Sequence, residues 1–490
     1  MTDDRRWRLV TVAVLLLAAT GIWLLAGAGG NAHRAHVVAE GVPLDEVHPA
    51  GLATGERRPG IVVAHGFAGS ARLMAQFGDT LAAHGYPAVL LDFSGHGANR
   101  DPLPSDDDAL QRDLAVAVAH LRTMPDVDPS RIGLVGHSMG ATAVTRFAAG
   151  HPAIGATVAI SLPDGSVALP GRPARLLMLV GGLEFPGFRQ AADDAIAAGG
   201  PAREARIVPG VEHISILYAP RTHRETTAWL DDAFGKPPNA ASAPSPLRRV
   251  GGAALLMAAF AAGVLPLARL LLGRPTGGLP RFEPTLIGRV AAVTAVATIP
   301  AVLLAPLLPT DRLPLSPGGY LVGLFTVTGT AMLAGRKYGR TTPPPNPPPS
   351  RPRLAIAAPV LIGYAAAAIA LPVHLGLTAA VPTGARWWLL PVVWAAFAVL
   401  AYAAERLSGG NSYAVLAVSA VAVIALSAAA VVGLTSTFVL LIVPLLAALL
   451  LWQAGWSAIL HAFAAPSWLI ALVGSLLVAW PMATALPVTG

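Results

Sequence analysis

The stretch RIGLVGHSMGATAVTRFAA (131–149) decides the fold of the most informative part of the chain. An apolar β run, IGLVG, leads into Gly-His-Ser-Met-Gly, and an Ala-rich helical run follows. This G-x-S-x-G pattern in a strand–turn–helix context needs a very tight turn, which lifts the hydroxyl of Ser138 above a sheet. Gly136 and Gly140 remove side chains that would collide there. We therefore predict that Ser138 is a nucleophile rather than an ordinary turn residue.

A second apolar strand lies upstream, in GIVVAHGFAGS (60–70), and ends in His-Gly-Phe. A Gly-bearing loop after a strand can present a backbone N–H to developing negative charge. We expect an oxyanion hole formed by the N–H of Phe67 and by the N–H of Met139, which begins the helix after Ser138. His65 is interpreted as a brace for this loop rather than as a catalytic group.

An acid and a histidine follow Ser138 in the order that a Ser–acid–His triad requires. Glu184 lies just past the buried strand of ARLLMLVGGLEF, and His213 follows the Pro-Gly turn of EARIVPGVEHISI. His213 would take the serine proton as general base, and Glu184 would hold the imidazole in the correct tautomer. Asp164, which follows the preceding strand, remains an alternative acid.

Five short motifs in this region resemble the α/β-hydrolase superfamily. They are HGFAG (65–69), LDFSGHG (91–97), GHSMG (136–140), GGLE (181–184) and VEH (211–213). The resemblance covers about residues 59–235 and implies a doubly wound, mainly parallel sheet flanked by helices. Many relatives have Asp where Glu184 stands, which is why Asp164 stays open.

The alternation of strand and helix signals agrees with this fold. We expect strands near 60–65, 87–92, 131–136, 155–161, 175–181 and 204–208. Relatives often insert a lid after the strand that is sixth in the family and corresponds here to 155–161. The interval from 161 to 175 is too short to hold one. The predicted domain therefore has no lid insertion. Its active site would be open, or covered by the membrane surface or by outer loops of the helical region.

The composition excludes a wholly soluble protein, a disordered chain and a disulfide scaffold. Of 490 residues, 54% are hydrophobic, 12% are charged and none is cysteine. Thiol nucleophiles and thiolate metal sites are therefore excluded, and no metal-ligand cluster or phosphate-binding loop stands out, so we expect neither metal nor cofactor. Residues 34–247 carry a net charge of −5 and the rest +12. The basic excess thus accompanies apolar segments, and nucleic acid is not an expected partner.

Apolar segments long enough to cross a bilayer occupy both ends of the chain. The first, 9–27, follows Arg5, Arg6 and Arg8 and is interpreted as an anchor, with a cleaved signal peptide as the alternative. Further spans are predicted near 250–272, 286–308, 318–335, 354–378, 386–404, 413–433, 435–452 and 463–484. The predicted domains are an anchor (1–33), a hydrolase domain (34–235), a Pro/Ser/Ala linker (236–249) and an all-α transmembrane bundle (250–490).

The charge of the loops predicts the orientation of these spans. The loop 336–353 is basic and has no acidic residue, so it should face the cytoplasm, as should Arg274 and Arg281. Alternate crossings then put the hydrolase domain on the extracytoplasmic face of the cell membrane. The late acids, Asp311 and Glu405, are predicted to lie outside the spans, which disfavours an ion-coupled transporter.

These observations together predict a multi-pass membrane serine hydrolase that cleaves a carboxylic ester, thioester or amide through an acyl-Ser138 intermediate. Its expected partners are membrane lipid and a small or lipid-like acyl substrate, and protein partners are left open. An acyltransferase with the same triad is one alternative. A non-catalytic exported binding domain on a membrane scaffold is another.

Overall fold

The computed structural model describes residues 3–104, 108–200, 202–235, 244–278, 280–335 and 349–490. Internal contacts divide the chain into two compact units. We call Met1–Thr20, Leu255–Pro372 and Ala385–Leu486 the helical unit, and Gly21–Ala254, Val373–Gly384 and Pro487–Gly490 the sheet unit. The division does not follow the chain linearly, because two short segments from its second half belong to the sheet unit.

The described part of the sheet unit contains an eight-stranded sheet in the order β1-β2-β4-β3-β5-β6-β7-β8. The strands are β1 (His33–Ala39), β2 (Val42–His48), β3 (Arg58–Ala64), β4 (Ala88–Leu91), β5 (Val127–His137), β6 (Ile154–Ile160), β7 (Arg175–Gly181) and β8 (Ala202–Val208). From β4 to β8 all neighbours are parallel, whereas β1 and β2 pair in antiparallel fashion. The predicted mainly parallel sheet is confirmed, and each predicted strand has a counterpart.

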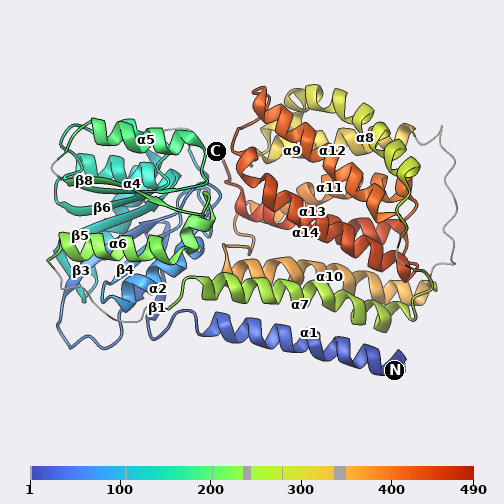
Figure 1. Cartoon of the computed structure of the whole chain (residues 1–490), viewed down its shortest axis with the longest axis horizontal. Helices are drawn as coiled ribbons and strands as arrows, with labels where there is room; N and C mark the ends of the chain where they lie inside the picture. Colours follow the sequence, from blue (N-terminus) through green and yellow to red (C-terminus); the bar gives the residue numbers. More distant parts are fainter. Residues whose placement is uncertain (1–2, 105–107, 201, 236–243, 279, 336–348) are drawn as a thin grey trace. The chain divides into compact units, whose positions relative to one another are not determined.

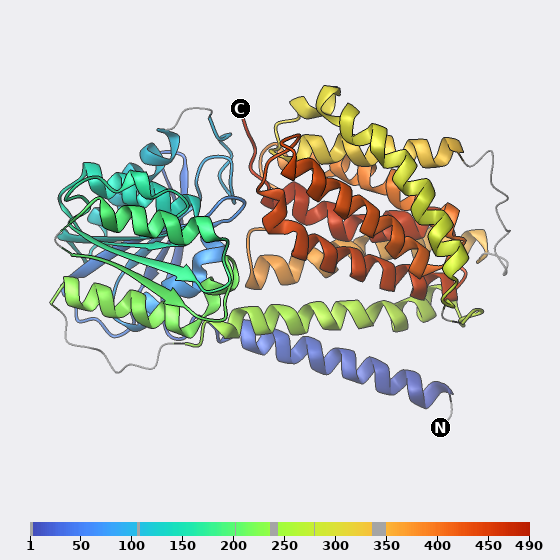
Figure 2. The same ribbon diagram turned by 45° about the horizontal axis from the view of Figure 1, so that its top comes forward.

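Helices cover both faces of the sheet (Figures 1 and 2). Alternate β3 side chains point to opposite faces, as strand geometry requires. One face packs against α2 (Ala75–Ala83) and α6 (Pro220–Ala233). The other packs against α3 (Ala109–Thr123), α4 (Met139–Gly150) and α5 (Pro186–Ala197). Between β6 and β7 the chain forms only the short helix η2 (Gly165–Val167), which agrees with the predicted absence of a lid insertion.

Nine helices among the described residues are long and apolar enough to cross a membrane. They are α1 (Asp3–Ala26), α7 (Leu247–Leu272), α8 (Pro284–Leu304, continued to Leu307 by η4), α9 (Gly318–Gly335), α10 (Arg351–Gly376), α11 (Arg386–Ser408), α12 (Ser412–Val431), α13 (Val439–Ala462) and α14 (Ser467–Ala485). Within the helical unit, α11 packs against α9 and α14, and α12 packs against α8 and α13 (helices labelled in Figure 1). The number of predicted spans agrees with these helices, but several ends differ.

The largest difference from the predicted spans lies in α13, which begins and ends later than the predicted 435–452. Its second half carries Ser457 and His461, which lie beyond the predicted span. Both side chains bond Glu405, at 2.7 Å from Ser457 Oγ and 2.6 Å from His461 Nε2. Glu405 lies inside α11 and is buried, not beyond its span as predicted. Satisfied partners make such a carboxylate tolerable inside a helical bundle.

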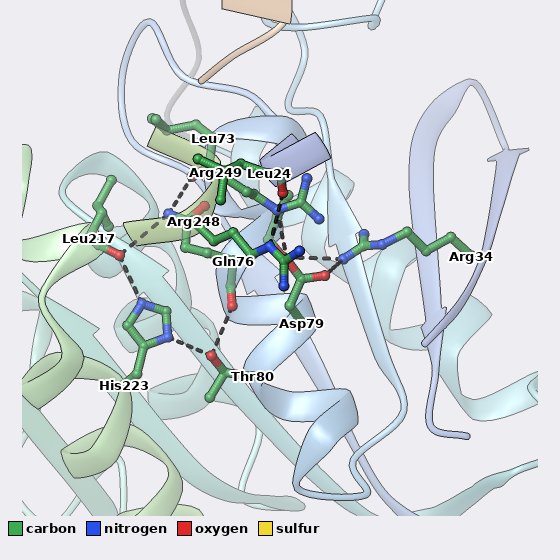
Figure 3. Close-up of polar contacts among 11 residues, drawn as sticks. Leu24, Arg34, Leu73, Gln76, Asp79, Thr80, Leu217, His223, Arg248 and Arg249 are labelled. Carbon is green, nitrogen blue, oxygen red and sulfur yellow. Dashed lines mark hydrogen bonds and ion pairs between the residues drawn. The ribbon is translucent and has the colours of Figure 1, made fainter. Parts of the chain in front are cut away.

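The start of α7 is tied to the remainder of the sheet unit by arginines (Figure 3). Arg249 donates from Nε to Asp79 at 2.7 Å, and Arg34 of β1 bonds the other carboxylate oxygen. Arg248 donates to the carbonyl of Leu24, near the end of α1, at 3.1 Å. The buried carboxylate of Asp79 therefore joins a strand, a helix of the sheet's flank and the first turn of α7. Of the predicted linker and basic loop, residues 236–243 and 336–348 lie outside the described residues.

Candidate active site

Strand β5 and helix α4 meet at Ser138, whose backbone has φ 52° and ψ −118°. A positive φ is rare for a residue with a Cβ atom and marks a strained turn held by its surroundings. A Cβ on Gly136 would lie 2.3 Å from the carbonyl oxygen of Gly140, and one on Gly140 would lie 2.5 Å from that of His65. Both glycines are therefore required sterically, as the pattern predicted.

The structure brings Ser138, His213 and Glu184 together in one hydrogen-bonded chain. His213 Nε2 lies 3.0 Å from Ser138 Oγ, and His213 Nδ1 lies 2.6 Å from Glu184 Oε1. The imidazole and the carboxylate are shielded from solvent, with side-chain exposures of 6% and 0%. With Glu184 ionised, Nδ1 carries the proton, which leaves the Nε2 lone pair facing the serine hydroxyl.

Glu184 is held by the turn that ends β7. Its second carboxylate oxygen accepts the N–H of Gly181 at 2.6 Å, and its own N–H donates to the carbonyl of Gly181 at 3.2 Å. A Cβ on Gly181 would lie 2.6 Å from the carbonyl oxygen of Val211. The glycine thus lets the His213 loop approach the strand end closely enough for the acid to reach the ring.

Asp164, the alternative acid, lies elsewhere. It is exposed and caps the short helix η2, where its side chain accepts the N–H of Ser166 at 2.9 Å. The carboxylate that faces the His213 ring is that of Glu184.

A second histidine, His137, positions His213 and was not singled out in the sequence. Its Nε2 donates to the backbone carbonyl of His213 at 2.9 Å, and the two ring centroids lie 4.8 Å apart. The ring of Phe188 packs against His213 at 4.7 Å. Burial lowers the pKa of His137 well below 6.5, and the nearby His213 lowers it further. A neutral His137 places no competing charge beside the base. The sequence offered one signal for this residue, which is its position directly before the serine of the G-x-S-x-G motif.

The loop after β3 runs past the serine turn. A Cβ on Gly66 would lie 2.8 Å from His137 Nδ1 and 3.1 Å from Ser138 Cβ, so the backbone before Phe67 passes directly beside the nucleophile. Ala68 has a φ of 57°, and the N–H of Gly69 donates to the carbonyl of Gly66 at 2.9 Å, which closes a tight turn around Phe67. Met139 is the first residue of α4, where backbone N–H groups have no intrahelical acceptor.

His65 braces this loop from behind, as its position in the sequence suggested. Its Nδ1 donates to the carbonyl of Gly66 at 2.7 Å, and its Nε2 accepts the N–H of Phe93 at 3.1 Å. Complete burial lowers its pKa to about 3, so the ring is neutral and has both nitrogens engaged. This arrangement leaves His65 without a free nitrogen for chemistry on a substrate.

Asp92 links the same loop to the one after β4. Its two carboxylate oxygens accept the N–H of Ala71 at 2.6 Å and that of Ala98 at 2.7 Å. Burial raises its pKa to about 6, although these two bonds favour the ionised form. Among the described residues, no group of three or more His, Cys, Asp or Glu side chains is placed to hold a metal ion.

Comparisons with known proteins match part of the sheet unit to a family. Residues 55–192 match the sequence model of the family described as serine aminopeptidase, S33. An uncharacterized protein of Mycobacterium tuberculosis strain H37Rv is 31% identical over 130 residues, and a protein of strain CDC 1551 matches equally. The aligned part is 26% of this chain and 46% of each relative, so the match spans about half the length of these curated relatives.

Solved structures with a similar outline include two esterases. A Pyrococcus furiosus esterase is 19% identical with a TM-score of 0.34, and covers 42% of this chain and 94% of its own. A thermophilic esterase of Thermogutta terrifontis is 16% identical with a TM-score of 0.36, and covers 42% and 96%. The family match and the eight-stranded sheet agree with each other. The chain contains an α/β-hydrolase domain, joined to a region of apolar helices long enough to span a membrane.

Proposed function

We propose that this domain is a serine hydrolase that cleaves carboxylic esters, with Ser138, His213 and Glu184 as its catalytic residues. The observation that carries the proposal is the hydrogen-bonded chain from Glu184 through His213 to Ser138. Ser138 Oγ attacks the substrate carbonyl carbon while its proton passes to His213 Nε2. Glu184 keeps the ring in the tautomer that accepts this proton and stabilises the imidazolium that forms.

The negative charge of the tetrahedral intermediate falls on the former carbonyl oxygen. The backbone N–H groups of Phe67 and Met139 are the proposed donors to it, and each such donor contributes roughly 100- to 1000-fold in rate. Collapse expels the alcohol, which takes the proton from His213 and leaves an acyl ester on Ser138. A water molecule, deprotonated by His213, then releases the carboxylic acid and restores the hydroxyl.

The substrate class is a carboxylic ester in the first place, with a small or lipid-like acyl group. Amide and thioester cleavage use the same steps, and the matched family is described as an aminopeptidase. Chromogenic p-nitrophenyl esters of increasing chain length and aminoacyl p-nitroanilides, assayed side by side, separate these classes. The p-nitrophenolate and the p-nitroaniline that these substrates release are both coloured, so both series can be followed by absorbance.

We further propose that the domain faces the outside of the cell membrane. The sheet unit includes the end of the first apolar helix, the start of the second, the end of the fifth, the residues that lead to the sixth and the residues after the ninth. Alternate crossings put all five positions on one side. The other side receives the basic N-terminus and the basic loops at 273–283 and 336–353, which the positive-inside rule assigns to the cytoplasm.

The absence of cysteine from the sequence makes this orientation testable with single introduced thiols. Thr123→Cys lies on the exposed end of α3, and Thr276→Cys lies exposed in the loop after α7. A membrane-impermeant maleimide applied to intact cells should label the first variant, and should label the second only after lysis. The reverse pattern would contradict the proposed orientation without bearing on catalysis.

A fluorophosphonate probe tests the enzymatic proposal itself. It should label the purified full chain at Ser138, and Ser138→Ala should abolish both labelling and ester hydrolysis. Ser130→Ala, which removes an exposed serine hydroxyl bonded to Asp128, is the matched control and should label normally. Absence of labelling in the folded native chain would refute the proposal and favour a non-catalytic binding domain. Product analysis with added acyl acceptors distinguishes hydrolysis from acyl transfer.

A further inference from the structure

The segment Val373–Gly384, which joins α10 to α11, belongs to the sheet unit and contacts the loops beside the candidate active site. We propose that it positions the oxyanion loop, so that Thr378 and Thr383 act on catalysis from outside the hydrolase sequence region. This inference rests on the proposed function and deepens it. It means that a connection between two apolar helices helps to shape the hydrolase site.

The first contact is made to Ser70, three residues after Phe67. Ser70 is fully buried, and its Oγ lies 2.8 Å from Thr378 Oγ1 and accepts the N–H of Ala379 at 3.0 Å. The same oxygen accepts the N–H of Leu73 at 3.4 Å and caps the short helix η1 (Ala71–Met74). Two of its three partners therefore come from the segment that joins α10 to α11.

The second contact is made to the loop after β4. Thr383 Oγ1 donates to the carbonyl of Gly97 at 3.2 Å. Gly97 precedes Ala98, whose N–H bonds Asp92, and Asp92 in turn holds Ala71 next to Ser70. The segment thus contacts both of the loops that Asp92 bridges, one on each side of the carboxylate.

A second stretch from the far end of the sequence supports the same loop. The N–H of Val488 donates to the carbonyl of Gly95 at 2.9 Å, and the N–H of Leu103 donates to the carbonyl of Val488 at 2.7 Å. A Cβ on Gly95 would lie 2.5 Å from that carbonyl oxygen. His96 lies in this loop, between Gly95 and Leu103, and its ring centroid is 5.8 Å from that of Phe67.

These contacts converge on the residue proposed as an oxyanion donor. Phe67 lies in the tight turn that ends at Gly69, and the next residue is the one that Thr378 holds. On its other side, the ring of His96 is backed by a loop that Thr383 and Val488 fix. Loss of the Thr378 hydroxyl would leave the Ser70 hydroxyl oxygen with two of its three partners, the N–H groups of Ala379 and Leu73. The turn would then gain freedom where the donor must be placed within a fraction of an ångström.

The test compares Thr378→Val with Thr378→Ser in the full chain in detergent micelles. Valine keeps the volume but deletes the hydroxyl, whereas serine keeps the hydroxyl. Thr123→Val is the matched control, since it deletes a hydroxyl–backbone bond of 2.7 Å at the surface end of α3. We expect Thr378→Val to lower kcat for a p-nitrophenyl ester by about 10-fold with KM nearly unchanged, and Thr378→Ser to restore it.

Hydrogen exchange of the amides of residues 66–71 provides a second measurement that does not depend on turnover. Exchange should quicken in Thr378→Val and in Thr383→Val, and not in the Thr123 control. If the native chain hydrolyses esters and Thr378→Val matches the control in kcat, the positioning role is refuted while the proposed function stands. If the native chain neither labels nor hydrolyses, the proposed function fails, and unchanged exchange at residues 66–71 would overturn the positioning role separately.

Discussion

Replacement of Glu184 by Gln tests whether the acid identified in the structure controls the tautomer of His213. The carboxylate uses one oxygen for His213 Nδ1 at 2.6 Å and the other for the N–H of Gly181 at 2.6 Å. A glutamine has only one oxygen for these two partners. With that oxygen kept on the Gly181 N–H, the amide NH₂ faces Nδ1, which must then accept. The proton moves to Nε2, where it blocks uptake of the Ser138 proton.

The expected loss of kcat follows from this change of the His213 tautomer. A triad whose acid becomes the corresponding amide loses about 10,000-fold in kcat, which corresponds to about 5 kcal/mol of transition-state stabilisation. The side chain is fully buried, so bulk water does not replace the lost acceptor. The assay is steady-state hydrolysis of a p-nitrophenyl ester, with thermal unfolding measured in parallel to show that the variant folds.

Two variants make this result specific. Asp164→Asn alters the exposed acid that the sequence left open and should retain native kcat. Glu184→Asp keeps the charge one methylene further from the ring and should lie between the native chain and Glu184→Gln. If Glu184→Gln stays within a few-fold of native activity while Asp164→Asn loses it, the assignment of the acid from the structure is wrong.

Three further predictions concern the framework of the sheet unit. Gly140→Ala should prevent the serine turn from forming, because the added Cβ would meet a backbone carbonyl at 2.5 Å; loss of fluorophosphonate labelling and a lowered Tm check it. Asp92 has a pKa of about 6 in the folded chain and a lower one when unfolded, so the native state holds a proton that the unfolded chain releases between about pH 4 and 6. Stability should therefore fall by roughly 3 kcal/mol as pH rises through that window, and Asp92→Asn should flatten the dependence in urea unfolding. Asp79→Asn should cost about 2 kcal/mol in the same measurement, because Arg34 and Arg249 lose the buried carboxylate that they share (Figure 3) but are themselves partly exposed.

The sequence could predict the parallel part of the sheet because most of its strands are short apolar runs between helical segments. It missed the β1–β2 hairpin, whose signal is weaker. There, polar residues interrupt the strands, and the two-residue turn is Glu40–Gly41, with φ of 46° and 87°. A Glu-Gly turn of this kind favours a hairpin, as Asn-Gly or Asp-Gly would more clearly.

The residues of the candidate site fall into two groups by the kind of signal that they leave. Ser138, Glu184 and His213 each follow a strand end, so chain order and topology were enough to propose that they meet. His137 and Asp92 act by hydrogen bonds to the backbone of residues distant in sequence. The residue type does not indicate which backbone group a histidine or an aspartate will bond, so these two roles could be recognised only in the structure.

The same limit applies to Glu405, which sequence reasoning placed beyond its helix because a charge is costly inside a bilayer. That cost is set by what surrounds the group. The serine and the histidine that bond it lie on α13, more than fifty residues later, and no local pattern connects them to it. A buried carboxylate in a helical bundle can only be predicted together with its partners.

A single helix would suffice to anchor an enzyme, so the other apolar helices call for a physical reason. The contacts of Thr378, Thr383 and Val488 supply one. Two stretches that lie after α10 and after α14 are built into the sheet unit, on the loops that flank the proposed oxyanion donor. If those contacts position the donor, the hydrolase sequence region alone lacks part of its own active-site support. The apolar helices are then required to deliver these segments, and a domain excised after α6 should label with a fluorophosphonate more slowly than the full chain.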